Sequence, residues 1–127
     1  MSSVILVIED NKKHSIIFED ILIDEGYEVE KAIDGEEVRQ KMDESTGGGK
    51  HFDLLLVDIA VLDFDAIDFI KKYKETHRVL VVSAYADGKD VSELIDAKWR
   101  IKKPFDENIF IERVKEILSS TIDEVKK

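Results

Sequence analysis

A small set of polar residues could perform chemistry together, because each stands at the end of a short stretch that is predicted to be a strand. The set contains three carboxylates, a hydroxyl and an amine: Glu9, Asp10, Asp58, Ser83 and Lys103. Carboxylates brought together repel one another, by roughly 4 kcal/mol for each pair at about 4 Å and an effective dielectric of about 20, so such a cluster needs a cation. Ligands that are all oxygen suit Mg²⁺, which proteins hold through one or two carboxylates.

A carboxylate is also a nucleophile toward phosphorus. The acyl phosphate that forms would be stabilised by the metal ion, by the charge of Lys103 and by a hydroxyl such as that of Ser83. The residue types therefore predict phosphoryl transfer onto Asp58.

The elements that must position these residues alternate between strand and helix patterns. Apolar runs predict strands over residues 4–8, 54–57 and 79–82. A more polar stretch over 27–33, in which charges alternate with apolar residues, and a short piece over 99–102 are predicted as the two remaining strands. Apolar residues at helical spacing predict helices over 12–24, about 35–42, 67–73 and 91–97, and a last helix after Pro104 with Asp106 as its N-cap. The three consecutive glycines at 47–49 predict a surface loop over 44–50.

Five strands that alternate with five helices predict an α/β fold with a doubly wound, five-stranded parallel sheet, because parallel strands need crossover connections. We expect the flavodoxin-like order 2-1-3-4-5, with the charged strand over 27–33 at an edge. Functional sites in such sheets lie at the carboxyl ends of the strands. The polar residues all follow strand ends, so we expect them to meet on one rim.

Composition limits the classes of function. With 127 residues, of which 43% are hydrophobic, the chain can build one domain over 1–127, including a polar helical tail over 119–127. Its net charge of −10 opposes binding to nucleic acid or to an anionic membrane. The absence of cysteine excludes thiolate metal sites and cysteine nucleophiles. The first apolar run is too short for a leader or a membrane span, so we expect a cytoplasmic protein.

Four stretches of the sequence resemble the receiver domain of response regulators in two-component signalling, in particular single-domain receivers of the chemotaxis-regulator type. They are VIEDN at 7–11, LLLVDIA at 54–60, VVSAYAD at 81–87 and KPF at 103–105. The resemblance covers essentially the whole chain. It implies that Asp58 is phosphorylated from the phosphohistidine of a histidine kinase or a histidine phosphotransfer protein, and that a downstream protein partner recognises the result.

The resemblance also implies roles for the neighbouring residues. Asp10 and Asp58 would bind magnesium directly together with the backbone carbonyl of Ala60, while Glu9 would act mainly through water. Lys103 would pair with the phosphoryl group, and Ser83 would move to hydrogen-bond it. The Lys103–Pro104 peptide bond is expected to be cis. Such a domain is not an enzyme for other substrates, since it catalyses only its own phosphorylation and dephosphorylation.

The sequence departs from the family pattern at three places. After Asp58 the chain has Val61-Leu62 where the family commonly has Met-Pro, and Asp65-Ala66 where it has Asp-Gly. Arg100 stands three residues before Lys103, where the family usually has a Tyr or Phe that rotates inward. We therefore expect a differently shaped loop after Asp58 and an unusual partner surface.

Two other functions remain open. The departures favour a degenerate receiver that binds partners without being phosphorylated, whereas the retained carboxylates, serine and lysine oppose it. The Asp-x-Asp of DFDAI at 63–67 suggests a magnesium-dependent phosphatase with an aspartyl nucleophile, but it lies beyond the strand end that Asp58 already marks. The residues His14, His51 and His77 show no ligand spacing, so we expect surface positions and assign them no role. Trp99 and Tyr85 are interpreted as packing or interface aromatics.

Overall fold

The structure is a computed structural model that describes residues 2–49, 51–61 and 63–121. Within these residues, five parallel strands form one sheet in the order β2-β1-β3-β4-β5, which confirms the predicted flavodoxin-like topology. The strands are β1 (Val4–Ile8), β2 (Glu28–Ala32), β3 (Leu54–Val57), β4 (Val79–Ser83) and β5 (Arg100–Lys102). The charged strand β2 lies at an edge, as expected.

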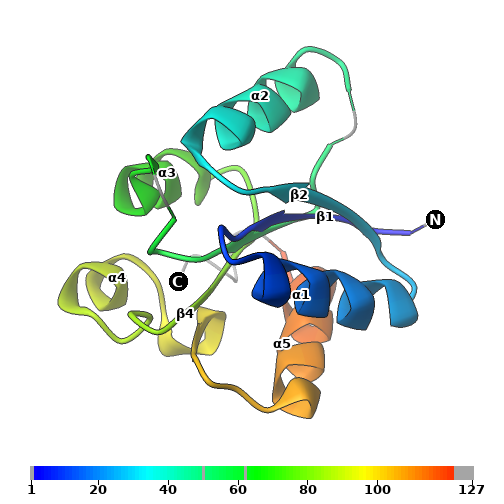
Figure 1. The fold of residues 1–127 in the computed structure, drawn as a ribbon. Coiled ribbons are helices and arrows are strands. Elements are labelled where there is room, and N and C mark those ends of the chain that lie inside the picture. The colour runs from blue at the N-terminus through cyan, green and yellow to red at the C-terminus, as the bar shows by residue number, and fades with distance from the viewer. Residues whose placement is uncertain (1, 50, 62, 122–127) are drawn as a thin grey trace.

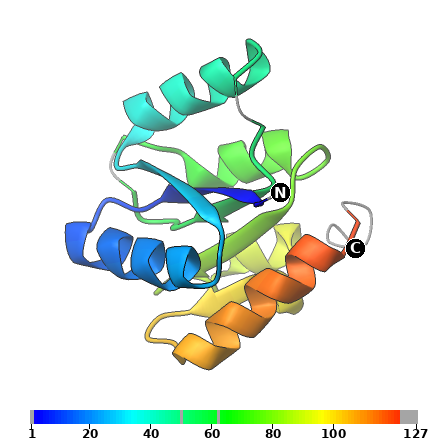
Figure 2. The same ribbon diagram turned by 90° about the vertical axis from the view of Figure 1, so that its right-hand side faces the viewer.

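Helices cover both faces of the sheet (Figures 1 and 2). Helices α1 and α5 lie side by side on one face, and α2, α3 and α4 lie on the other. The helices are α1 (Lys12–Asp24), α2 (Gly35–Thr46), α3 (Ala66–Tyr73), α4 (Lys89–Leu94) and α5 (Glu107–Ser119), with a 3₁₀ turn η1 (Ala97–Trp99) before β5. Since helices shield both faces, every residue of β1, β3 and β4 is buried, which explains their unbroken apolar runs.

Four of the helices begin at a polar residue that caps their first turn. The caps are Asn11, Asp34, Asp65 and Asp106, whose side-chain oxygens lie between 2.8 and 3.1 Å from backbone nitrogens of the helix that follows. Each such bond satisfies a donor that the helix itself leaves unpaired. Because every cap follows a strand by a few residues, the caps fix the loops at the carboxyl edge of the sheet.

Several predicted boundaries were wrong. Strand β2 spans Glu28–Ala32 instead of 27–33, and helix α3 begins at Ala66 instead of residue 67. Helix α2 continues to Thr46, because the polar residues after Met42 are compatible with a helix and the first glycine comes only at Gly47. Helix α4 spans Lys89–Leu94 instead of 91–97, because Ile95 turns to an extended conformation. Trp99 belongs to the 3₁₀ turn and is buried there, so β5 begins one residue later than expected.

The end of the chain was expected to be a helical tail. Helix α5 ends at Ser119, and Ser120 is extended, with φ −95° and ψ 159°. The hydroxyls of both serines donate to the carbonyl oxygen of Glu116, and Arg78 donates to the carbonyl oxygen of Ser120 at 2.9 Å. These bonds satisfy backbone and side-chain groups at the helix end. Residues 122–127 lie outside the described part of the chain.

The loop between β3 and α3 packs tightly against the start of α2. A Cβ atom added to Gly35 would stand 1.8 Å from the carbonyl oxygen of Asp63, so only glycine allows this approach. Asp63 itself has φ 53°, in the left-handed region. The loop therefore has a special conformation, as the departures after Asp58 had suggested, although Leu62 lies outside the described residues.

Candidate functional site

The carboxyl ends of β1, β3, β4 and β5 surround a cavity of about 220 Å³. The structure brings together on its wall all of the residues that the sequence had placed on one rim: Glu9, Asp10, Asp58, Ala60, Ser83 and Lys103. Asn11, His14, Ala84 and Tyr85 complete the lining. The parallel topology explains this meeting, because strands that run in the same direction end at the same edge.

The ammonium group of Lys103 has an acceptor for each of its N–H donors. Its Nζ atom donates to Asp58 Oδ2 at 2.8 Å, to Glu9 Oε1, and to His14 Nδ1 at 3.1 Å. An ammonium group can only donate, so the His14 ring accepts through Nδ1. The side chains of Lys103, Asp58 and Glu9 are only 13%, 9% and 2% exposed, which makes these charged hydrogen bonds largely shielded from water.

Burial and hydrogen bonding act in opposite directions on the two carboxylates. Burial would raise the pKa of Asp58, but hydrogen bonds from Lys103, Ala60 and Ser83 outweigh it and hold that pKa below the ordinary value. Burial dominates at Glu9 and, with the nearby charge of Asp58, raises its pKa even though Lys103 opposes the change. Asp58 is therefore the carboxylate that stays ionised most readily.

Two further groups orient Asp58. The backbone N–H of Ala60 donates to Asp58 Oδ1 at 3.0 Å, and the Ser83 hydroxyl lines the same cavity and helps to lower the pKa of Asp58. Ser83 is fully buried at the end of β4, and its Oγ atom also accepts from the backbone N–H of Tyr85 at 3.2 Å. Asp58 thus has donors on both oxygens in a fixed arrangement.

A divalent cation is implied by the donor types at this site. Glu9, Asp10 and Asp58 offer only oxygen atoms, and their three negative charges exceed the single positive charge of Lys103, so the set suits a hard cation such as Mg²⁺. Asp10 is exposed on the rim. Among the described residues, no three His, Asp or Glu side chains are arranged as a metal cluster. Lys103 forms an ion pair with one oxygen of each of the two buried carboxylates, Glu9 and Asp58.

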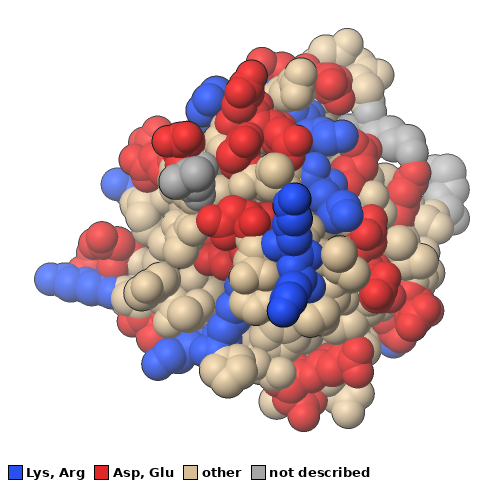
Figure 3. Space-filling model, viewed as in Figure 1, with Lys and Arg blue, Asp and Glu red and all other residues tan. Residues whose placement is uncertain are grey.

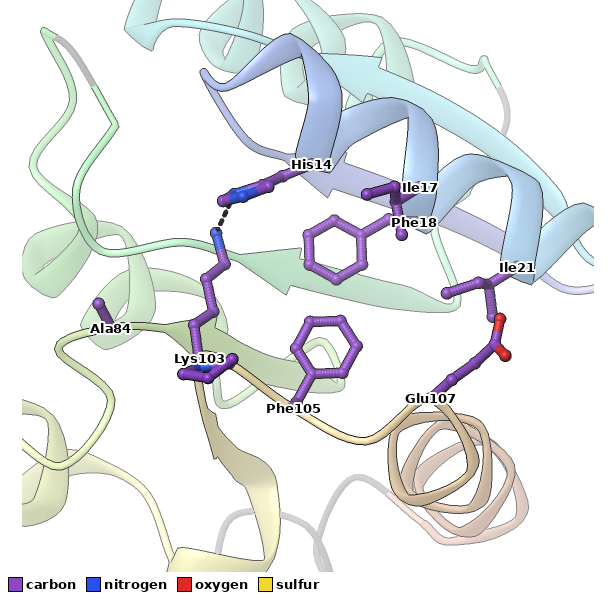
Figure 4. A pocket seen from close by; sticks show the side chains of 9 residues that line it. His14, Ile17, Phe18, Ile21, Ala84, Lys103, Phe105 and Glu107 are labelled. Atoms are coloured by element: carbon purple, nitrogen blue, oxygen red, sulfur yellow. Dashed lines mark hydrogen bonds between the residues drawn. The ribbon is translucent and has the colours of Figure 1, made fainter.

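An apolar groove of about 590 Å³ lies beside the acidic cavity (Figure 4). Ile17, Phe18 and Ile21 of α1 line one side, and Phe105 comes from the loop before α5 on the other. The groove and the cavity share His14, Ala84 and Lys103 as wall residues. Ile17 is half exposed at this groove.

His14 and His51 lie at exposed surface positions, as expected, whereas His77 is half-buried. His14 is exposed but hydrogen-bonds Lys103, a contact that its place in the first turn after the acidic pair could have signalled. His77 is half-buried, and its ring stacks on that of His51 with 5.2 Å between centroids. This pair lies before β3 and β4, at the opposite edge from the cavity. Burial and the neighbouring His51 lower the pKa of His77.

One further prediction from the sequence is confirmed. The Lys103–Pro104 peptide bond is cis. Figure 3 shows Asp and Glu side chains spread over one face of the molecule, with Lys and Arg side chains in patches between them. No helix in the described ranges has the length and apolar character needed to cross a bilayer.

Comparisons with known proteins place this architecture among signalling domains. The family model of the response regulator receiver domain matches residues 5–115. Sporulation initiation phosphotransferase F of Bacillus subtilis (strain 168) is 28% identical over 123 residues, which cover 93% of this chain and 95% of that protein. Transcriptional regulatory protein CpxR of Escherichia coli (strain K12) is 28% identical over 118 residues, 90% of this chain and 48% of the relative. The chain thus spans about half the length of the first curated relatives that it matches.

Solved structures have the same fold. A CheY-like receiver domain protein from Methanospirillum hungatei JF-1 superimposes with a TM-score of 0.77 at 25% identity, covering 93% of this chain and 94% of that one. The chemotaxis response regulator CheY4 of Vibrio cholerae gives a TM-score of 0.77 at 20% identity, over 92% of this chain and 99% of that one. The likeness to CheY4 supports the fold alone.

Proposed function

Because this chain belongs to the response regulator receiver domain family, we propose that Asp58 accepts a phosphoryl group and thereby switches a surface that binds a protein partner. The observation that carries the proposal is the contact of 2.8 Å between Lys103 Nζ and Asp58 Oδ2. This contact helps to keep the pKa of Asp58 below the ordinary value, so the carboxylate is ionised. The carboxylate follows the central strand β3 and lines the cavity that a phosphodonor would enter.

The reaction is an attack of one Asp58 carboxylate oxygen on the phosphorus of a phosphohistidine. A P–O bond forms as the P–N bond breaks, and the donor imidazole leaves and takes up a proton. Lys103 and Ser83 line the same cavity as Asp58, and they would donate hydrogen bonds to the new phosphoryl oxygens. Mg²⁺, held by Asp10, Asp58 and the Ala60 carbonyl with Glu9 behind them, would neutralise negative charge on the transferred group.

The groove beside the cavity supports a protein as the phosphodonor. Its apolar wall could receive a helix, and His14 and Lys103, which line both spaces, mark the passage toward Asp58. A helix that carries a phosphohistidine would bring its negative charge to Lys103 while its apolar side contacts Ile17 and Phe105. We propose a histidine kinase or histidine phosphotransfer protein in this role, which would place the chain in the cytoplasm.

The relatives support this reading. Phosphotransferase F, which aligns over nearly its whole length, is named for phosphoryl transfer, and CpxR is a regulatory protein that aligns over about half of its length. We propose that the phosphorylated form of this chain acts through a downstream protein partner. Chemistry on other substrates is not part of the proposal, since the domain would catalyse only the formation and loss of its own aspartyl phosphate.

The proposal is tested by the intact mass of the protein after incubation with a small acyl phosphate and Mg²⁺. We expect one phosphoryl addition, which is lost in Asp58→Ala and in a sample without Mg²⁺. Asp63→Ala is a matched control that removes a nearby acid outside the cavity and should keep the addition. If the wild-type protein gains no mass, the degenerate receiver, an interaction module without phosphorylation, becomes the better account.

A further inference from the structure

Two histidine rings meet at the amino-terminal edge of the sheet, on the side opposite the acidic cavity. His51 lies in the link that enters β3, and His77 lies in the link between α3 and β4. Their ring centroids are 5.2 Å apart, with 29° between the ring planes. Because β3 and β4 are parallel neighbours, the links that enter them begin at the same edge. The pair is thus a product of the topology, which the spacing of histidines in the sequence does not reveal.

The hydroxyl of Thr76 determines which nitrogen of the His77 ring carries the proton. Thr76 Oγ1 donates to the carbonyl oxygen of Tyr73 at 3.4 Å, and it lies 2.9 Å from His77 Nδ1. Since the hydroxyl gives its proton to that carbonyl oxygen, its own oxygen accepts from the N–H at Nδ1. The lone pair on Nε2 of His77 is therefore free to bind a ligand.

The surroundings of His77 keep its ring neutral and in place. Burial, together with the charge of the neighbouring His51, lowers the pKa of His77. The ring of Tyr73 packs edge-on against it, with 5.5 Å between centroids and 89° between the planes. His51 is exposed, so the pair can be reached from solvent on that side. A neutral imidazole is the form of histidine that binds metal ions.

We propose that His51 and His77 form a binding site for one divalent transition-metal ion of the class of Zn²⁺, Ni²⁺ and Cu²⁺. Two imidazoles on a tetrahedral Zn²⁺ ion, with Zn–N bonds of about 2.0–2.1 Å, have their ring centres roughly 5 Å apart. This is close to the separation in the structure, so turning the rings suffices to bring one nitrogen of each to the ion. The hydrogen bond of Thr76 at Nδ1 is the kind of contact that orients a histidine ligand.

The choice of ion follows from the ligands. Imidazole nitrogen suits Zn²⁺, Ni²⁺ and Cu²⁺, whereas Mg²⁺ prefers oxygen ligands. No third His, Asp or Glu joins the two rings among the residues that the structure describes, so water would fill the other positions. The bound ion would connect the links that enter β3 and β4. The site is separate from the acidic cavity, and it does not depend on the proposed phosphorylation.

The first test is a titration of the full chain with Zn²⁺, followed by NMR of the histidine ring nitrogens. Mg²⁺ is kept in excess, so that it competes for the carboxylates of the acidic cavity. We expect the signals of His51 and His77 to shift and to saturate at one Zn²⁺ per chain, while those of His14 stay unchanged. Shifts at His14 alone, or no shift at His51 and His77, would overturn the proposal.

The second test measures Zn²⁺ affinity by calorimetry in three variants under the same conditions. Thr76→Val keeps the shape of the side chain but removes the hydroxyl, and we expect it to weaken binding about tenfold or more. His51→Gln removes an exposed ligand without disturbing the core, and it should weaken binding further. Glu44→Gln, which removes an exposed acid from α2, is the control and should bind as the wild type does. Equal affinities in His51→Gln and Glu44→Gln would show that the two rings only stack and would overturn the proposal.

Discussion

Lys103 Nζ lies 2.8 Å from Asp58 Oδ2, although the two residues are 45 positions apart in the sequence. The same ammonium group bonds Glu9, so one lysine compensates two buried carboxylates that come from β1 and β3. Burial would lower the pKa of Lys103, but the hydrogen bonds that its ammonium group donates to Asp58 and Glu9 outweigh this effect and raise that pKa, so the amine stays charged. The proposed phosphoacceptor site is thus also a balance of charge inside the fold.

Replacing Lys103 with Met should destabilise the protein strongly. The change leaves the charges of Glu9 and Asp58 buried without a partner, which costs about 3–5 kcal/mol in the free energy of unfolding. Urea denaturation measures this loss, with Lys102→Met as an exposed neighbouring control. We also expect added Mg²⁺ to restore more stability in Lys103→Met than in the wild type, because the cation can then neutralise both carboxylates. A loss no larger than that of Lys102→Met would contradict this account.

The contact between Gly35 and Asp63 predicts a second sensitive position. In Gly35→Ala the new Cβ atom would stand 1.8 Å from a backbone oxygen, so α2 and the loop after β3 must separate. We expect a loss of about 1–3 kcal/mol in the free energy of unfolding, measured by urea denaturation. Gly47→Ala, at the exposed end of the same helix, should change it by only about 0.5 kcal/mol. Equal effects at the two positions would show that the close approach does not matter.

The pair of His77 and His51 predicts a pH dependence of stability. The pKa of His77 is lowered in the folded protein, so the unfolded chain, with the ordinary value near 6.5, binds its proton at higher pH. The contribution of His77 to the free energy of unfolding is therefore complete above about pH 6.5, and it decreases as the pH falls toward the pKa of His77 in the folded protein. The free energy of unfolding is measured by urea denaturation at pH 7.5 and pH 5.5, roughly one unit on either side of 6.5. The decrease between these two pH values should be smaller in His77→Gln than in the wild type. An identical loss in the variant would assign the dependence to other groups.

The sequence predicted most of the fold because the central strands are buried on both faces. Continuous apolar runs such as 54–57 have few alternatives to a parallel strand between helices. The boundaries of α4 and β5 could not be predicted in the same way. Helix α4 has six residues and no side-chain cap, and the turn that buries Trp99 depends on contacts with α5 and β4. Such short elements are determined by tertiary packing rather than by local pattern.

The members of the candidate site were predictable because their positions follow from topology alone. The carboxyl ends of parallel strands meet, so Asp58, Ser83 and Lys103 had to lie close together. Which side chain bonds which could not be read from the sequence, because it depends on rotamers and on distances between elements. The hydrogen bond that Lys103 donates to His14, and the bonds that the Arg100 guanidinium donates to the carbonyl oxygens of Ile95 and Ala86, belong to this second class.

The central claim is that the phosphoryl group resides on Asp58, and locating that group tests it most directly. An aspartyl phosphate is an acyl phosphate, and borohydride reduces it to homoserine, which peptide mass spectrometry can place in the sequence. After treatment with a small acyl phosphate and Mg²⁺, we predict homoserine at position 58 and its absence when Mg²⁺ is withheld. Homoserine at position 10 or 63, or at no position, would contradict the account.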